Sequence, residues 1–110
     1  MTLVAACHCG DVRVEVEGPP SYLNECQCSV CRRYGALWGY YRGDQVRVSG
    51  AVEAYTWGQG ELEFCRCRRC GCVSHWQMAD GDRSRLAVNG RLFEPGDLEG
   101  VPVRQSPGPD

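Results

Sequence analysis

The sequence predicts an all-β protein with little or no helix, and three observations support this class. Apolar and polar residues alternate along most of the chain, as they do in strands that bury one face. Turns rich in glycine, proline and aspartate separate these short runs. The nine cysteines stand in three tight groups in or beside such turns. We therefore expect about eight short strands with cysteine-bearing turns between them.

The alternating runs place the expected strands in order along the chain. The first run has Val12, Val14 and Val16 on one face, and Gly18-Pro19-Pro20 stops it. The other runs end at similar turn residues and cover 37–42, 45–49, 51–57, 61–64, 73–78 and 83–88. We expect 45–49 to pair with 51–57 across Gly50, and 73–78 to pair with 83–88 across the turn 79–82. Short helical segments are expected only around 30–34 and 95–98.

The 110 residues predict a single domain. We place this domain at 1–105 and expect a frayed tail at 106–110. The net charge of −2 argues against a nucleic-acid partner, because surfaces that bind nucleic acid are strongly basic.

Cellular context also follows from the pattern of residues. No apolar stretch approaches the roughly 18 residues of a membrane span, and the first residues lack the features of a signal peptide. We expect no membrane contact and a cytoplasmic location, where cysteines stay reduced. An exposed edge strand would support a homodimer.

The cysteine spacing indicates metal ligands. Cys-x-Cys and Cys-x-x-Cys spacings direct two sulfurs of one turn at a common centre, and two such turns complete a tetrahedral zinc site. Disulfides fit less well, because the cysteine count is odd and a Cys-x-Cys pair is too cramped for an unstrained bridge. The groups are Cys7 and Cys9; Cys26, Cys28 and Cys31; and Cys65, Cys67, Cys70 and Cys72.

Two neighbouring ligands cannot close a four-coordinate site, so Cys7 and Cys9 need partners from elsewhere in the chain. Cys67 and Cys70 form a Cys-x-x-Cys-Gly turn, in which Gly71 permits the backbone bend. Pairing the two turns gives a closed site of four cysteines, and a closed site is structural because it has no position left for a substrate.

The middle group differs, because Cys26, Cys28 and Cys31 offer three ligands within one short segment. Three protein ligands leave a tetrahedral ion one open position, which catalytic zinc requires. Alternatively, a fourth ligand closes this site as well. The candidates for that ligand are His8, His75, Cys65 and Cys72, although both of these cysteines could equally be small buried residues.

The order of the cysteine groups resembles that of a known family. Three motifs carry the likeness: Cys7-His8-Cys9-Gly10 before an alternating strand, then 26–33, then 67–71. Together they resemble the glutathione-dependent formaldehyde-activating enzyme family, also called the centromere protein V family. The segment 88–101 is similar to short bacterial members.

This resemblance implies a fold of several small, coiled antiparallel β-sheets stapled by two zinc ions. It implies a structural zinc at Cys7, Cys9, Cys67 and Cys70, and a second zinc at the proposed catalytic group of Cys26, Cys28 and Cys31. The activity ascribed to the family joins glutathione to formaldehyde to give S-hydroxymethylglutathione, which is a carbon–sulfur lyase type of reaction run in reverse. A small thiol and an aldehyde are the substrates that it implies.

The chemistry of an open middle site can be argued from its ligands. Zinc with three thiolates is a weak Lewis acid for water but binds another soft sulfur donor, so it would hold a thiol as thiolate beside a carbonyl carbon. Arg32 and Arg33 could hold a substrate carboxylate, or be solvated surface cations.

Aromatic residues near the middle group also allow two interpretations. Trp38, Tyr40 and Tyr41 could wall the site, or form strand core with an exposed face. Two functions remain open: a zinc enzyme acting on thiol–aldehyde adducts, and a non-catalytic binding module that zinc stabilises.

Overall fold

We analysed a computed structural model of the chain, which describes residues 1–108. Ten strands, one six-residue α-helix and three 3₁₀ turns together make up more than half of it. The strands are β1 (Thr2–Ala6), β2 (Arg13–Glu17), β3 (Leu23–Cys26), β4 (Trp38–Tyr41), β5 (Val46–Ser49), β6 (Val52–Tyr55), β7 (Leu62–Cys67), β8 (Val73–Met78), β9 (Leu86–Asn89) and β10 (Val103–Ser106). The helix is α1 (Ser29–Tyr34), and the 3₁₀ turns are η1 (Gly43–Gln45), η2 (Gly90–Leu92) and η3 (Pro95–Leu98).

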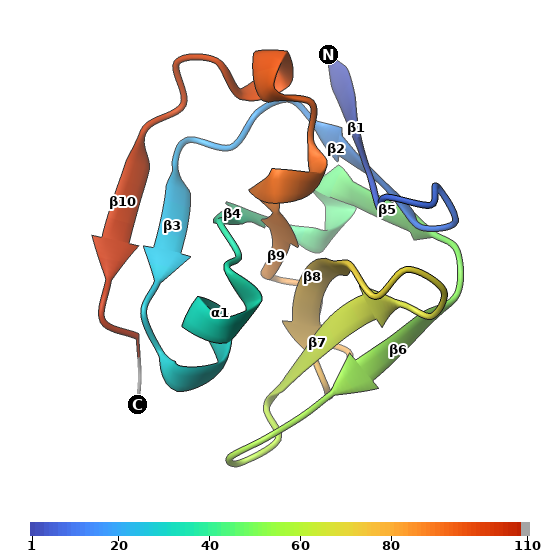
Figure 1. Cartoon of the computed structure of the whole chain (residues 1–110), viewed down its shortest axis with the longest axis vertical. Coiled ribbons are helices and arrows are strands. Elements are labelled where there is room, and N and C mark those ends of the chain that lie inside the picture. The colour runs from blue at the N-terminus through green and yellow to red at the C-terminus, as the bar shows by residue number, and fades with distance from the viewer. Residues whose placement is uncertain (109–110) are drawn as a thin grey trace.

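The strands form two sheets, so the all-β class predicted from the sequence is confirmed (Figure 1). The smaller sheet has the order β1-β2-β5, and the larger has the order β10-β3-β4-β9-β8-β7-β6. All pairs are antiparallel except β10 with β3, which run in parallel. The two predicted helical segments are present as α1 and η3.

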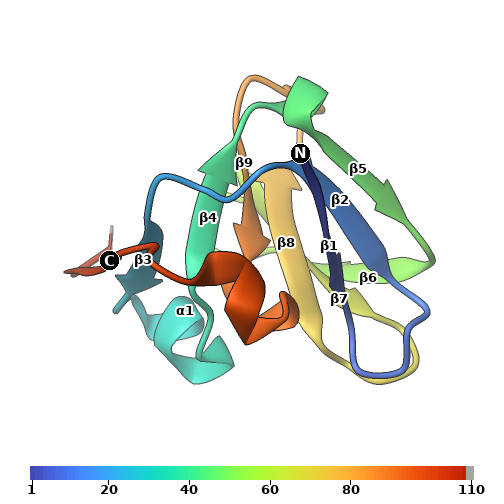
Figure 2. The same ribbon diagram turned by 90° about the horizontal axis from the view of Figure 1, so that it is seen from above.

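The main core lies between the two sheets, and the alternating valines of β2 are buried in it, as their pattern predicts. Val14 and Val16 are fully buried, while the charged residues between and beside them face solvent. They pack with residues of the two neighbouring strands, β1 and β5, and with residues of β4 and β9 in the larger sheet. Figure 2 shows the three-stranded sheet as a separate layer. The buried members of this core are Leu3, Ala5, Val14, Val16, Tyr41, Val46, Leu86, Val88 and Phe93.

One predicted strand pair is wrong. Strands β5 and β6 do not pair across Gly50, because β5 pairs with β2 and β6 pairs with β7. Gly50 has φ +103°, and a Cβ at this position would overlap the backbone of Asp11. The close approach therefore requires glycine, and the chain crosses here from one sheet to the other instead of folding back as a hairpin. By contrast, β8 and β9 do pair, as the turn 79–82 predicts.

The boundary of the predicted frayed tail also needs correction. Ser106 is the last residue of β10 and lies opposite Cys26 of β3, and its carbonyl accepts a hydrogen bond from the amide of Gln27 at 2.8 Å. Gly108 packs against the same cysteine. The tail through 108 is therefore part of the larger sheet and its surroundings, whereas 109–110 lie outside the described residues. Within residues 1–108, no helix is long and apolar enough to cross a membrane.

Candidate metal centres and pocket

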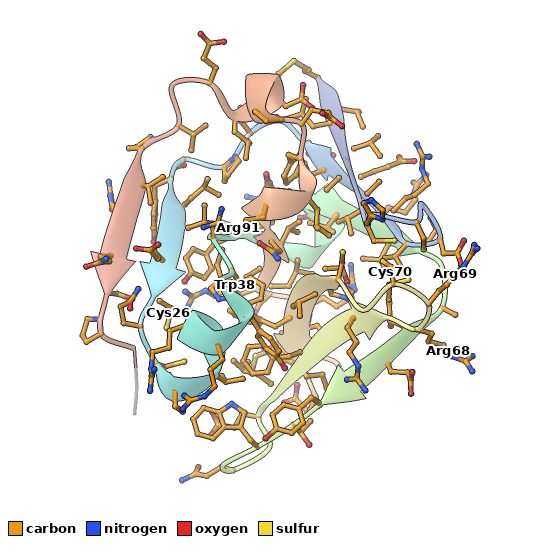
Figure 3. All side chains as sticks on the ribbon, viewed as in Figure 1. Cys26, Trp38, Arg68, Arg69, Cys70 and Arg91 are labelled. Atoms are coloured by element: carbon orange, nitrogen blue, oxygen red, sulfur yellow. The ribbon has the colours of Figure 1, made fainter. Side chains whose placement is uncertain are left out.

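The first cysteine cluster joins two turns that are far apart in the sequence. Cys7 and Cys9 follow β1, while Cys67 ends β7 and Cys70 lies in the turn before β8. All four sulfurs lie within 4.8 Å of one another. Figure 3 shows Cys70 on the side of the molecule opposite Cys26, so the two cysteine clusters are separate.

The sulfur spacing of this first cluster fits a tetrahedral ion. The Cys9 sulfur lies 3.6 Å from that of Cys7 and 3.6 Å from that of Cys67. Four sulfurs at about 2.3 Å from a central zinc would be roughly 3.8 Å apart. Cys7 and Cys67 are buried, whereas Cys9 and Cys70 are partly exposed. The cluster can therefore hold a metal ion with four protein ligands.

Backbone amides point at these sulfurs and favour their charged form. The amide of Val12 donates to Cys7 at 3.2 Å. The amides of Cys70 and Arg69 donate to Cys67 and lower the pKa of that thiol. Hydrogen bonds from the backbone of Cys72 and then of Cys9 lower the pKa of Cys70 to about 5. Thiolates are what a metal requires, so the backbone around Cys67 and Cys70 favours ligation by these two residues.

The second cluster comes from one continuous segment. Cys26 ends β3, Cys28 caps the N-terminus of α1, and Cys31 lies on the first turn of that helix. The Cys28 sulfur accepts a hydrogen bond from the amide of Cys31 at 3.4 Å, which fixes the turn. Gly35, with φ +67°, ends the helix after six residues. The three sulfurs lie within 4.8 Å of one another, and all three residues are buried.

Protonation in the second cluster depends on burial and on the neighbouring groups. Burial raises the pKa of Cys31, although the indole N–H of Trp38 donates to its sulfur at 3.3 Å and lowers it. Burial also raises the pKa of Cys28, but hydrogen bonds from Cys31 and Cys26 outweigh this and leave the pKa lowered.

None of the four candidates for a fourth ligand joins the second cluster in residues 1–108. His75 is buried and its Nδ1 is 2.8 Å from the hydroxyl of Ser74. Burial lowers the pKa of His75 to about 4, so the ring is neutral at pH 7. The Cys65 thiol donates to the carbonyl of Glu63, and Cys72 lies beside the first cluster. His8 lies on the same first loop as Cys7.

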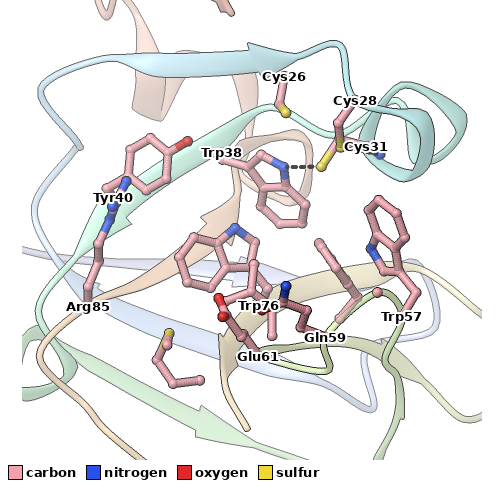
Figure 4. A pocket seen from close by; sticks show the side chains of 14 residues that line it. Cys26, Cys28, Cys31, Trp38, Tyr40, Trp57, Gln59, Glu61, Trp76 and Arg85 are labelled. Carbon is pink, nitrogen blue, oxygen red and sulfur yellow. Dashed lines mark hydrogen bonds between the residues drawn. The ribbon is translucent and has the colours of Figure 1, made fainter. Parts of the chain in front are cut away.

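The second cluster faces a pocket of about 630 Å³, which Figure 4 shows from close by. Five aromatic side chains contribute to the walls, and the three sulfurs lie at one side. The pocket-lining residues are Cys26, Cys28, Cys31, Trp38, Tyr40, Trp57, Gly58, Gln59, Glu61, Leu62, Phe64, Trp76, Met78 and Arg85.

The aromatic residues expected near the middle group divide between wall and core. Trp38 and Tyr40 line the pocket, whereas Tyr41 points the other way into the core between the sheets. The amide Nδ2 of Asn24 donates to the phenol oxygen of Tyr40 at 2.7 Å. Arg32 and Arg33 do not line the pocket, and Arg33 instead donates to the carbonyl of Ser29 on its own helix.

The structure adds pocket residues that the sequence did not reveal. Arg85 precedes β9, and its guanidinium carbon lies 4.6 Å from the centre of the Tyr40 ring. Trp57, Gln59 and Glu61 come from the connection between β6 and β7. In the sequence this connection shows only a glycine-rich turn, and pairing of β7 with β8 is what brings it over the pocket.

Three comparisons with known proteins agree. Residues 2–101 match the family model described as glutathione-dependent formaldehyde-activating enzyme. A protein of Halomonas elongata, provisionally named as such an enzyme, is 46% identical over a match that covers 61% of this chain and 52% of that protein. The chain thus spans about half the length of this curated relative.

The structural comparison covers more of the chain. The crystal structure of a Rhodobacter sphaeroides protein superposes with a TM-score of 0.75 at 33% identity. The match covers 93% of this chain and 100% of that one, so the arrangement of strands described above is shared across nearly the whole domain.

Proposed function

The chain belongs to the glutathione-dependent formaldehyde-activating enzyme family, and on that premise we propose that it is a two-zinc protein that joins a small thiol to an aldehyde. In the forward direction the thiol sulfur bonds to the carbonyl carbon, and the carbonyl oxygen takes up a proton to become a hydroxyl. The reverse reaction breaks the same carbon–sulfur bond, which makes the activity lyase-like.

The observation that carries this proposal is the contrast between the two clusters. Four cysteines at the first cluster would fill the coordination sphere of a tetrahedral ion, whereas the second cluster would offer an ion only three sulfurs and faces a pocket. We assign structural zinc to Cys7, Cys9, Cys67 and Cys70, and the catalytic zinc to Cys26, Cys28 and Cys31. A zinc ion at the second cluster would supply a position where a thiol is held as thiolate at neutral pH.

The residues around the second cluster suit this chemistry. Trp38 donates its indole N–H to the Cys31 sulfur, which spreads the negative charge of the cluster and fixes that ligand. The aromatic side chains of the pocket give a bound adduct an apolar surface to pack against.

Tyr40 is our candidate for the group that assists the aldehyde oxygen as negative charge develops on it. Because Asn24 Nδ2 can only donate, it occupies a lone pair of the phenol oxygen and leaves the phenol proton for a substrate. Burial raises the pKa of Tyr40, although Asn24 and Arg85 partly oppose the rise, so the hydroxyl remains protonated at neutral pH. The role we propose for Tyr40 is hydrogen-bond donation to the developing alkoxide.

The test measures metal content together with exchange between free and bound formaldehyde. We expect two zinc ions per chain, and exchange between ¹³C-formaldehyde and S-hydroxymethylglutathione, followed by NMR, that is faster than without protein. Cys28→Ser should return exchange to the uncatalysed rate while far-ultraviolet circular dichroism stays unchanged. Tyr40→Phe should slow exchange by about 10²-fold or more without loss of zinc.

The proposal would be overturned if the wild-type protein did not raise the exchange rate above the rate measured without protein. If Cys28→Ser instead unfolds the chain as a variant of the first cluster does, the second metal is structural, and the protein is a zinc-stabilised binding module.

A further inference from the structure

Arg85 is a solvent-exposed cation that lines an otherwise mostly apolar pocket. Its guanidinium lies over the rings of Tyr40, at 4.6 Å, and Trp76, at 5.9 Å. Among residues 1–108 it makes no hydrogen bond or ion pair. Arg83 and Arg91, by comparison, donate to the backbone carbonyls of Gly43 and Gly35 respectively. The stacked position of Arg85 therefore has no role in holding the backbone together.

Contact with the rings leaves the N–H donors of the guanidinium available. Its carbon lies 4.6 Å from the centre of the Tyr40 ring, and a planar guanidinium carries five N–H donors. That planar fork matches a carboxylate, to which it can donate two parallel hydrogen bonds. Figure 4 shows Arg85 beside Tyr40, across the pocket from the three cysteines. One ligand in this pocket could thus face both the sulfurs and the guanidinium.

The pocket carries negative charge that the Arg85 cation can offset. Three thiolates around Zn²⁺ carry a formal charge of −1, and Glu61 adds a second negative group at the wall. An acidic thiol entering such a pocket is repelled unless a positive group offsets that charge. Within the described part of the chain, Arg85 is the single cationic residue among those that line the pocket.

We propose that Arg85 binds a carboxylate of the thiol substrate and so makes the pocket selective for acidic thiols. This inference rests on the function proposed above, because it assumes that the thiol end of the ligand lies at the cysteine cluster. It replaces the sequence-based suggestion that Arg32 or Arg33, which directly follow Cys31, would hold the substrate carboxylate.

Tryptophan fluorescence can report binding directly, because the chain has three tryptophans and Trp38, Trp57 and Trp76 all line this pocket. The probes are glutathione, S-methylglutathione, which keeps the carboxylates but has no free thiol, and glutathione dimethyl ester, which keeps the thiol but has no carboxylate. For the wild type we expect saturable quenching with both acids. Arg85→Gln should weaken binding of both acids by about tenfold or more and leave the ester unaffected.

Two further variants separate recognition from structure. Arg85→Lys should restore part of the affinity for the acids, because it keeps the charge but not the planar fork. Arg32→Gln is the matched control, since it removes an exposed arginine near Cys31 that does not line the pocket, and it should bind all three probes as the wild type does.

The inference would be overturned if the wild type and Arg85→Gln bound the acids with equal affinity, or if Arg85→Gln lost affinity for the acids and for the ester to the same extent. It would also be overturned if the wild type showed no saturable binding of the acids. Its failure is distinguishable from failure of the proposed function. S-methylglutathione cannot form an adduct, so its dependence on Arg85 would persist in a protein that catalyses no formaldehyde exchange.

Discussion

The two cysteine clusters use the same ligand atoms but differ in how much chain they connect. In the first cluster, Cys9 and Cys67 are 58 residues apart, and their sulfurs lie 3.6 Å from each other. The second cluster is contained in 26–31 and closes almost no loop. Cross-linking distant segments removes much more entropy from the unfolded chain than cross-linking adjacent ones. The spacing of the cysteines along the chain, more than their chemistry, therefore distinguishes the cluster that we expect to support the fold from the cluster that lines the pocket.

The largest difference in unfolding free energy is expected between matched serine substitutions in the two clusters. Cys70→Ser should remove the closed metal site and cost about 5 kcal/mol or more of unfolding free energy, which is comparable with the whole stability of a small domain. Cys28→Ser should change the unfolding free energy by about 1 kcal/mol, because it opens no long loop. Chemical denaturation of both variants in the presence of zinc measures the difference.

The comparison would fail if both substitutions destabilised the chain equally. A useful control is zinc content after dialysis: each variant should retain one ion per chain when folded, so that a difference in stability cannot reflect a difference in the number of ions lost.

An intermediate effect on stability is expected from a buried histidine in the sheet between the two clusters. His75 lies on β8, next to the pocket residue Trp76 but on the opposite face, and it is directly across from Cys65 of β7. Its side chain is 2% exposed, and burial lowers its pKa from 6.5 to about 4. Between these pH values the unfolded chain binds a proton that the folded chain does not, so stability is present above pH 6.5 and is lost as the pH falls toward 4.

Over that window the histidine should account for a loss of about 3 kcal/mol of unfolding free energy. His75→Gln should remove this part of the pH dependence. Any metal bound at the cysteines would be lost from both proteins as acid protonates the thiolates, so the measurement is the difference between their denaturation midpoints at each pH. If the pH profiles of the wild type and His75→Gln were parallel, His75 would not contribute to the pH dependence of stability.

The smallest effect is expected from an ion pair that connects the same two turns as the first cluster. Arg69 lies 3.9 Å from Asp11, and both side chains are more than half exposed. Such surface pairs are worth about 0.5 kcal/mol or less. Arg69→Gln should therefore leave the melting temperature nearly unchanged at physiological salt. A large drop would mean that the charges, and not the sulfurs, connect these turns.

The sequence predicted the fold class because the strand pattern is strongly alternating where one face is buried. Val14 and Val16 made β2 recognisable. Strand β10 was missed because three of its four residues are exposed and give no alternation. The false pairing of β5 with β6 has a different cause: strand partners depend on contacts between distant segments, and a short connection alone does not specify them.

For the site, the sequence predicted which cysteines gather, because ligand spacing is a local property. It did not predict the pocket. Trp57 and Arg85 come from separate connections, and they meet near the second cluster only because β7 and β8 pair and β8 pairs with β9. Nothing local marks Arg85 as different from the other arginines.

The parallel pairing of β10 with β3 joins the segment of the second cluster to a strand that is synthesised much later. The side chains of Glu25 and Gln105 are hydrogen-bonded across these strands, although they are 80 residues apart in the chain. Chains are synthesised at roughly 5–20 residues per second. The three thiols are therefore made roughly 4–16 seconds before the strand that lies alongside them. Gly108 then packs so closely that a Cβ there would be 2.8 Å from the Cys26 sulfur. The segment that carries the three cysteines is therefore made well before the strand and the glycine that pack against it.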